Sequence, residues 1–411
     1  MLSPPLYKTY AVVLLNLAYL GSAMAQPMHT VGSGDNRDGY EQVEYKSASE
    51  QIERRAGGAQ SVGGEIPLGL PRLNVPIDRD RVALGRRLFF DRRLSVNATL
   101  SCAMCHIPEQ GFTQNEIATP VGLQGRSVRR NAPSLYNVAY QRSLFHDGRG
   151  VSLETQIWEP LLAHNEMGND SRQIVIKNLK AIEAYAVSFA KVFPDGVTAA
   201  NLGLALAAYQ RSLLSANSQF DRWFFGGDQT ALSPLAKKGF EIFKEVGCHT
   251  CHVLDDPSEG SGTLFTNHGF FNTGIGYRAA HADPPSKVQL APGVFVDLSI
   301  EIDLKTPFDN GRQEVSGLQG QRWHYRVPTL RNVALTAPYM HDGSLPTLQS
   351  VIEYYDQGGD RRDPGLDPRL RPLGLSQLNK QRLRSFLQAI TGSNVDALAA
   401  DGRSVEIGDR Q

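Results

Sequence analysis

The sequence predicts a mainly α-helical protein built from two domains of the same kind. The pattern C-x-x-C-H occurs twice, at residues 102–106 and at residues 248–252. Residues 133–160 match residues 328–355 in one gapless register, which indicates an internal repeat. Between the two C-x-x-C-H patterns, apolar residues recur at helical spacing without the alternation typical of strands. The predicted fold class is therefore mainly α, with two pseudo-symmetric c-type cytochrome domains.

The C-x-x-C-H pattern is the attachment signal for a c-type haem. Its two thiols can form thioethers with the vinyl groups of one porphyrin, and its histidine then binds the iron. A zinc site would need four thiolates together, but the two pairs lie far apart and each is followed directly by histidine. A thioredoxin-like C-x-x-C would not be expected twice with histidine next to it. We therefore expect two covalent haem c groups, which use Cys102, Cys105, His106, Cys248, Cys251 and His252.

Length and charge set further bounds. The 411 residues suffice for two domains, each with its own core. Lys plus Arg total 42 and Asp plus Glu total 42, so no basic excess points to a nucleic acid or to an anionic membrane surface. The haem motifs use all 4 cysteines. We therefore expect no disulfide and no nucleic-acid partner.

Residues 1–25 have the features of a secretory signal peptide. Lys8 supplies the positive charge, residues 11–20 form an apolar run too short to span a bilayer, and residues 23–25 form a small-residue cleavage site. The mature chain should begin at Gln26, with an uncleaved N-terminal anchor as the alternative. No other stretch suits a membrane helix. Together with covalent haem, this predicts a periplasmic protein that is not integral to the membrane.

Composition predicts how the rest of the chain is divided. Residues 26–70 are polar and form a flexible lead-in. Residues 71–232 form the first haem domain, residues 233–393 the second, and residues 394–411 a loose tail. Residues 255–321, within the second domain, form a long region rich in Gly and Pro whose role the sequence does not define.

Helices are predicted where apolar spacing coincides with capping signals. They cover residues 81–90, 153–159, 171–193, 198–224, 233–246 and 382–391. The fifth begins with Ser233 as N-cap and Pro234 at its first position, and Gly247 follows its end. Pro160 is expected to end the helix that begins at Leu153.

The internal repeat distinguishes the two haem sites. In the second copy Thr347 can cap a helix on which Leu348, Ile352 and Tyr355 share one apolar face. That face should point toward the haem and offer the Tyr355 hydroxyl to the iron. The repeat alone leaves open whether Tyr355 is an iron ligand or a buried core tyrosine.

The first copy places Pro160 at the position of Tyr355. The same helix face carries Leu153, Gln156 and Ile157. Proline has no side chain that can bind iron, so the first iron should keep an open sixth position where a small molecule can react. A plain helix stop is the alternative role for Pro160.

Five further motifs accompany the two haem motifs. They are Leu-Phe-Phe-Asp at 88–91, Arg-Asn-Ala-Pro at 130–133, Phe-His-Asp-Gly-Arg at 145–149, Asn-Glu-Met at 165–167 and Pro-Tyr-Met-His-Asp-Gly at 338–343. In this order they make the sequence resemble the bacterial di-haem cytochrome c peroxidase family, and within it the MauG-like branch. The resemblance covers about residues 71–391.

The resemblance implies a peroxide-dependent oxidoreductase with two different haems. The haem on His106 would react with hydrogen peroxide, with Gln156 orienting the peroxide and Glu166 moving its proton. The haem on His252 would carry Tyr355 as its second axial ligand, an anionic oxygen that lowers the potential. The alternative role for Glu166 is a solvated loop charge.

The resemblance also implies a calcium ion between the domains. Its ligands would be the Asn131 side chain and the carbonyl oxygens of Thr336 and Pro338, which are hard donors as calcium prefers.

Two positions depart from the family pattern. Leu123 stands where ordinary members carry a histidine that caps the active iron, so this site should be open without reductive activation. His146 stands where the family usually has a tryptophan between the haems, which puts the usual electron relay in doubt. Trp158 is a candidate substitute, with ordinary packing as the alternative.

The expected partners are hydrogen peroxide and a periplasmic redox protein, which could be a cytochrome, a cupredoxin or a protein substrate. One rival function is a pure electron-transfer di-haem cytochrome, and another is a haem-based redox sensor. A carrier would need both irons capped, and the combination of Pro160, Gln156 and Glu166 argues against that.

Overall fold

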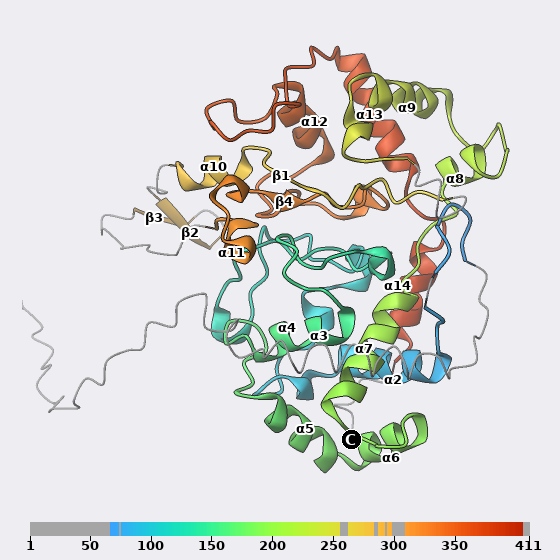
Figure 1. The fold of residues 1–411 in the computed structure, drawn as a ribbon, viewed down its shortest axis with the longest axis vertical. Coiled ribbons are helices and arrows are strands. Elements are labelled where there is room, and N and C mark those ends of the chain that lie inside the picture. The colour runs from blue at the N-terminus through green and yellow to red at the C-terminus, as the bar shows by residue number, and fades with distance from the viewer. Residues whose placement is uncertain are drawn as a thin grey trace, which may run out of the picture. The chain divides into compact units, whose positions relative to one another are not determined.

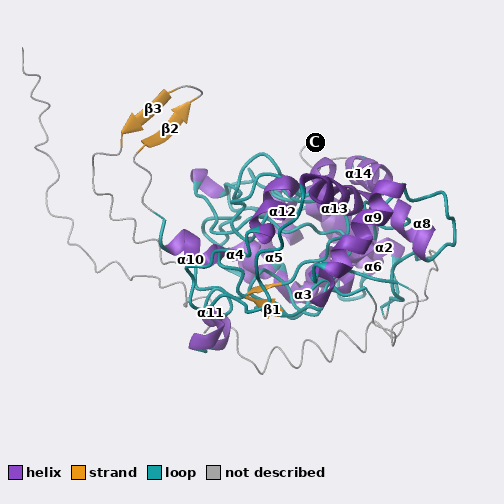
Figure 2. Cartoon of the chain, turned by 90° about the horizontal axis from the view of Figure 1, so that it is seen from above, coloured by secondary structure: helices purple, strands orange, loops and turns teal. Residues whose placement is uncertain are grey.

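The computed structural model describes residues 66–73, 75–254, 262–282, 287–291, 294–297 and 309–405. All of them lie within one compact unit, Ala48–Gln411. Helices predominate in these residues, and the strands form only two short antiparallel pairs (Figure 2). The predicted mainly α fold class is confirmed. The predicted signal peptide lies outside the described residues.

The first half of the fold is organised by α2 (Arg79–Phe90) and α7 (Ala199–Ser212), which pack side by side (Figure 1). Gly85 permits the close approach, because a Cβ at this position would collide with the carbonyl group of Ala205. The helices around this pair are α3 (Leu153–Gln156), α4 (Trp158–Leu162), α5 (Arg172–Ala181) and α6 (Glu183–Val192).

The second half repeats this arrangement with α9 (Pro234–Glu245) and α13 (Gln377–Ala389), which also lie side by side (Figure 1). Gly239 takes the role of Gly85, since a Cβ there would meet the carbonyl group of Arg382. As predicted, the Ser233 side chain caps α9. The remaining helices of this half are α8 (Gln219–Phe224) and α12 (Leu348–Asp356).

Each pair of helices anchors a hydrophobic core of its own. The first core includes Leu88, Phe89, Phe112 and Leu206, and the second includes Phe220, Leu232, Phe240, Phe265 and Phe386. Phe220 and Leu232 therefore pack with the second half, although both lie within the range 71–232 assigned to the first domain. The chain passes from one core to the other between Leu213 and Phe220.

The sequence repeat is also a repeat of backbone conformation. Asn137 and Asn332 both adopt the left-handed region, with φ of 59° and 62°, which asparagine tolerates better than most residues. The 3₁₀ helices η5 (Val138–Tyr140) and η8 (Val333–Leu335) follow them directly. Further along, the side chains of Ser152 and Thr347 cap α3 and α12. α3 and α12 thus start at equivalent positions of the repeat.

The region predicted to be long and loop-rich contains short elements where it is described. β1 (Phe270–Phe271) pairs with β4 (Tyr325–Arg326), and β2 (Lys287–Ala291) pairs with β3 (Val294–Asp297). The helices here are α10 (Ile275–Ala280), α11 (Gln313–Ser316) and the 3₁₀ helix η7 (Gln319–Gln321). The first half also contains the 3₁₀ helices η1 (Arg92–Leu94), η3 (Pro108–Gln110) and η4 (Leu123–Gly125).

The C-terminal segment is not a loose tail. Val395–Arg403 forms α14, which packs on η3 of the first half. Gly402 lies against the ring of Phe90, and Arg403 forms an ion pair with Glu109. The expectation failed because the partner surface of this short amphipathic helix lies far away in the sequence.

Pro160 does not end a helix. α3 already stops at Gln156, and α4 begins at Trp158 and runs through Pro160. The first backbone N–H groups of any helix have no intrahelical partner, so a proline in the first turn removes no hydrogen bond. The predicted helix of residues 153–159 is therefore two short helices.

Residues 66–70, predicted as part of the flexible lead-in, are packed. Leu70 is buried, and the guanidinium group of Arg331 donates a hydrogen bond to the carbonyl oxygen of Gly69. The same guanidinium forms an ion pair with Asp221 at 2.9 Å, and neither side chain has any exposed surface. Buried charges of this kind are kept only when they are paired. The contact with Gly69 ties the first described residues to the second half.

Candidate haem and peroxide sites

Both C-x-x-C-H motifs form a single tight turn. The first is η2 (Cys102–Met104) and the second is η6 (Cys248–Thr250). In each, the backbone N–H of the histidine donates to the carbonyl oxygen of the first cysteine at 3.0 Å. The turn therefore brings the two thiols and the imidazole of each motif close together.

The two motif histidines are oriented in the same way. Nδ1 of His106 lies 3.1 Å from the carbonyl oxygen of Phe112, and Nδ1 of His252 lies 2.9 Å from that of Phe265. Nδ1 carries the proton and donates in such a contact, which leaves Nε2 free to bind a metal. Burial lowers the pKa of both rings, that of His252 to about 4, so both are neutral. This is the state that an iron-binding histidine needs.

The motif thiols lie in apolar surroundings. Burial raises the pKa of Cys102 and Cys248 to about 12, and that of Cys105 to about 11. Apolar surroundings of this kind suit the large apolar plate of a porphyrin. Within the described residues, no group of 3 or more His, Cys, Asp or Glu side chains could hold a metal ion. The residues present therefore fit a haem c at each motif.

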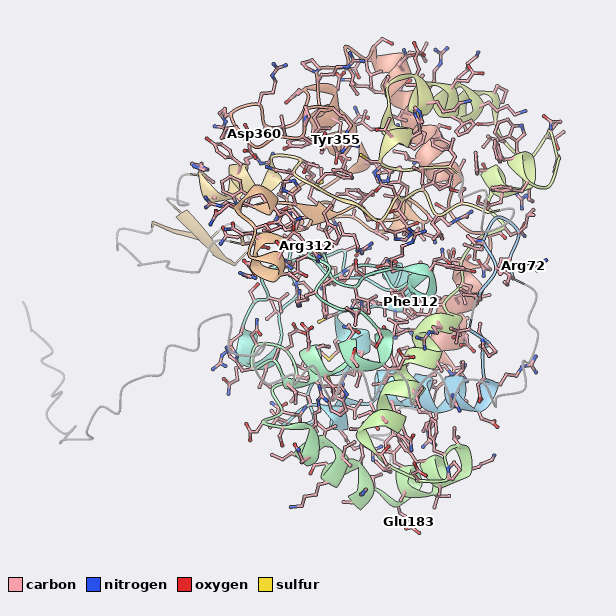
Figure 3. The ribbon with its side chains drawn as sticks, in the orientation of Figure 1. Arg72, Phe112, Glu183, Arg312, Tyr355 and Asp360 are labelled. Carbon is pink, nitrogen blue, oxygen red and sulfur yellow. The ribbon has the colours of Figure 1, made fainter. Side chains whose placement is uncertain are left out.

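Tyr355 lies close to the second motif. Figure 3 shows it on α12, away from Phe112 of the first half. Burial raises the pKa of Tyr355, and the neighbouring Tyr354 and the thiols of Cys251 and Cys248 raise it further. The Tyr354 hydroxyl donates to a backbone carbonyl at 2.7 Å, whereas no described residue hydrogen-bonds to the Tyr355 hydroxyl. A bound cation would reverse the pKa shift and favour the phenolate.

At the first motif the equivalent position is Pro160, which begins a compact turn. The N–H of Met167 donates to the carbonyl oxygen of Pro160 at 3.1 Å, and the N–H of Glu166 donates to that of Ala163 at 2.9 Å. Met167 itself is buried in the first core. These bonds place Glu166 beside the residue that replaces the tyrosine.

The carboxyl group of Glu166 is half-buried and close enough to the first motif to raise the pKa of both thiols there. Burial raises the pKa of Glu166 to about 7, although the positive charge of Arg149 opposes this. Arg149 is already engaged, since it forms ion pairs with Glu159 at 2.6 Å and Asp147 at 3.1 Å. A carboxyl group with a pKa near 7 can both accept and donate a proton at neutral pH.

Of Leu123 and Gln156, only Leu123 has a described hydrogen bond to Glu166. The N–H of Leu123 donates to the carbonyl oxygen of Glu166 at 3.1 Å. Gly122 allows this contact, because a Cβ there would collide with the carbonyl oxygen of Asn165. Gln156 is the half-buried last residue of α3, and no described hydrogen bond joins its amide to the Glu166 carboxyl group.

The predicted calcium ligands come from two neighbouring segments. The Nδ2 of Asn131 donates to the carbonyl oxygen of Ala118 at 2.8 Å, which leaves its Oδ1 available. The N–H of Asn131 donates to the carbonyl oxygen of His341 at 2.7 Å, so the segment that carries Thr336 and Pro338 runs close by. That the three oxygens bind one ion remains a prediction.

A charged and aromatic cluster joins the two halves, and the sequence did not reveal it. Arg130 forms ion pairs with Asp147 and Asp309, both at 2.6 Å. The rings of Tyr325 and His341 stack next to Arg130, with centroids 3.6 Å apart and an interplanar angle of 12°. The only signal was that Arg130, Asp147 and His341 belong to recognisable motifs, because the pairing residues lie far apart in the sequence.

His146 borders this cluster, with its Nε2 2.9 Å from the carbonyl oxygen of Asn131. Trp158, considered as a substitute relay, is buried in the first core, with Arg172 over its ring. Its surroundings support the packing role.

None of the described helices is both long and apolar enough to cross a membrane.

The comparisons of sequence with known proteins agree on one family. The family model of di-haem cytochrome c peroxidase matches residues 79–230. The chain is 33% identical to methylamine utilization protein MauG of Methylorubrum extorquens, over 78% of this chain and 80% of that protein. It is 30% identical to cytochrome c551 peroxidase of Nitrosomonas europaea, over 78% of this chain and 83% of that protein. A crystal structure of a MauG-like protein associated with microbial copper homeostasis superimposes with a TM-score of 0.66 at 28% identity, and covers 85% of this chain and 99% of that chain.

Proposed function

The chain belongs to the di-haem cytochrome c peroxidase family, and from this premise we propose that it is a periplasmic enzyme with two unlike haem sites. Hydrogen peroxide is reduced at the site of His106. Electrons from a donor arrive through the site of His252 and Tyr355. The signal-like residues 1–25 and the covalent haem chemistry support the periplasmic location.

The asymmetry between the two sites carries the proposal. The second site has, beside the thiols of its motif, a phenol to which no residue of the described ranges donates or accepts a hydrogen bond. The first site has Pro160 at the equivalent position and an acidic group, Glu166, whose pKa is close to 7. One site therefore offers an iron ligand, and the other offers proton transfer.

An open haem supplies the iron position and the electrons for breaking the O–O bond, while the chain handles the protons. Peroxide reduction consumes two electrons and two protons and gives two molecules of water. The Glu166 carboxylate can accept the proton from one peroxide oxygen and return it to the other, which leaves as water. The Gln156 amide is suited to orient the peroxide, since it can donate and accept hydrogen bonds.

Tyr355 sets the character of the second site. A phenolate is a hard anionic ligand, which stabilises oxidised iron and lowers the reduction potential. A site of this kind suits the storage or relay of oxidising equivalents better than a high-potential port for electrons. This supports the MauG-like branch of the family over its ordinary peroxidases.

The electron donor is a periplasmic redox protein. The relatives are named both as cytochrome c peroxidases and as MauG, so a cytochrome, a cupredoxin or an oxidisable side chain of a partner protein all fit. We also propose one calcium ion, held by the Asn131 side chain and the carbonyl oxygens of Thr336 and Pro338. Such oxygens are typical calcium ligands.

A turnover assay tests the function directly. The purified di-haem protein is mixed with hydrogen peroxide and a reduced small c-type cytochrome, and cytochrome oxidation is followed by absorbance. The proposal predicts two cytochromes oxidised per peroxide, with Glu166→Gln as the matched slow variant. A chain that exchanges electrons with the cytochrome but leaves peroxide intact would be the pure electron carrier instead.

A further inference from the structure

Arg326 is a buried cation that has no acidic partner in the part of the chain that the structure describes. Only 7% of its surface is exposed, and its hydrogen bonds go to the backbone carbonyl oxygens of Phe145 at 3.2 Å and Val327 at 3.4 Å. No described carboxylate pairs with it, and burial lowers its pKa to about 10. A charge that is removed from water without a counter-charge is strongly unfavourable. The other deeply buried arginine, Arg331, has its carboxylate.

Arg142 places a second positive charge close to Arg326, since both act on His268. The charges of Arg142 and Arg326 help burial to lower the pKa of His268 to about 4. Nδ1 of His268 is buried without a hydrogen-bond partner. Protein groups here disfavour further positive charge, and an anion would relieve them.

The position of this cationic site relates it to the second haem motif. Arg326 lies on β4, opposite Phe270 of β1. Two residues before Phe270, His268 directly follows Asn267, whose N–H donates to the carbonyl oxygen of Cys251 at 2.9 Å. The N–H of Arg326 in turn donates to the carbonyl oxygen of His146 of the first half at 2.7 Å. The β1–β4 pair lies between the helices of the two halves (Figure 1).

We propose that Arg326, assisted by His268, binds the propionate carboxylates of the haem attached to Cys248 and Cys251. The planar guanidinium group matches a carboxylate with two parallel hydrogen bonds, which suits a buried site. Such a contact would balance the negative charge of the propionates with the charge of Arg326. This inference rests on the two-haem part of the proposed function and is independent of peroxide chemistry.

The same chemistry could serve a small diffusible anion. The propionate is favoured because the site adjoins the second motif and is closed to solvent. A diffusible anion would have to enter a position that is 7% exposed. The two sources differ in a measurable way, since a propionate is fixed by the thioether bonds and a free anion titrates.

The test is the midpoint potential of the His252 haem, measured by spectroelectrochemical titration of the intact di-haem protein. A positive charge beside the haem stabilises the reduced state, so Arg326→Gln should shift this potential downward while both haems stay covalently attached. Arg326→Lys keeps the charge but loses the planar fork, so it should shift the potential less and in the same direction. An unchanged potential in Arg326→Gln would overturn the proposal.

Two controls separate the alternatives. Arg369 is exposed, pairs with Asp367 and also lies near Cys251, so Arg369→Gln should leave the potential nearly unchanged. An equal shift in that variant would show a general charge effect and overturn the proposal.

Addition of phosphate or acetate should not shift the midpoint potential of the parent protein. A saturable shift that requires Arg326 would assign the site to a free anion. If Arg326→Gln loses its second haem, the potential of Arg326→Lys decides. None of these readouts depends on peroxide turnover.

Discussion

The backbone N–H of Leu123 donates a hydrogen bond to the carbonyl oxygen of Glu166 over 3.1 Å. The Leu123 side chain lies against Gly168 in the same turn. The position that carries a capping histidine in ordinary family members therefore holds an apolar side chain, fixed to the residue proposed to move protons. A leucine can shield the site from water but cannot bind iron.

The first prediction concerns activation. Because Leu123 offers no ligand, the fully oxidised enzyme should react with peroxide in its first turnover. Stopped-flow absorbance after mixing with peroxide should show no lag, and prior one-electron reduction should not raise the initial rate. A strict requirement for reduction would mean that another group caps the first iron.

The second prediction concerns the Glu166 side chain. Glu166→Gln keeps the size and the hydrogen bonding but cannot take a proton, so it should be nearly as slow as Glu166→Ala. General acid–base groups typically contribute about 10²–10⁴-fold, and a loss of this order is expected in the peroxide-dependent spectral change. Glu166→Asp should retain part of the rate. If Glu166→Gln reacts at the parent rate, the carboxyl group has no role in proton transfer.

The third prediction concerns pH. The pKa of Glu166 is about 7 in the folded protein and 4.5 without its surroundings. Between these values the folded state binds more protons than the unfolded state, so this group makes the protein less stable as pH rises. At about pH 8, Glu166→Gln should exceed the parent by roughly 1–3 kcal/mol in unfolding free energy, and by little at about pH 5.

The same group should give the parent enzyme a pH-dependent rate. The ionised carboxylate is the proton acceptor, so the peroxide reaction should rise as pH passes through about 7. Glu166→Gln should lack this rise. A parent profile that stays flat across neutral pH would contradict the pKa-based role.

The fourth prediction concerns calcium. Removal of calcium with a chelator should lower the thermal unfolding temperature, and added calcium should restore it. Asn131→Leu, which removes the proposed side-chain ligand, should make the protein insensitive to both treatments. A parent protein that gives the same unfolding temperature with chelator and with calcium would refute the site.

The features that short sequence motifs define could be predicted from the sequence. The C-x-x-C-H patterns and the repeat predicted two similar halves. The cap residues Ser233 and Thr347 predicted helix starts that the structure confirms. The internal repeat and helix periodicity placed Tyr355 on a helix face expected to point toward the second haem, and left its role open. These features depend on neighbours within a few residues.

The sequence was less informative where distant residues decide. α14 was missed because its partner surface on η3 comes from the other end of the chain. The pairing of Arg130 with Asp309, and that of Arg331 with Asp221, join segments that no local pattern connects. The break between α3 and α4 falls at Ile157, ahead of Pro160, and no local pattern marked it.

The central claim is that the first iron is open and the second is capped by Tyr355, and electron paramagnetic resonance of the fully oxidised protein tests it most directly. The parent should show one high-spin and one low-spin ferric haem. Tyr355→Phe should lose or alter the low-spin signal, while Tyr354→Phe, which removes a hydroxyl bonded to the carbonyl oxygen of Thr273, should leave it unchanged. Two low-spin haems in the parent, or an unaltered low-spin signal in Tyr355→Phe, would contradict the account.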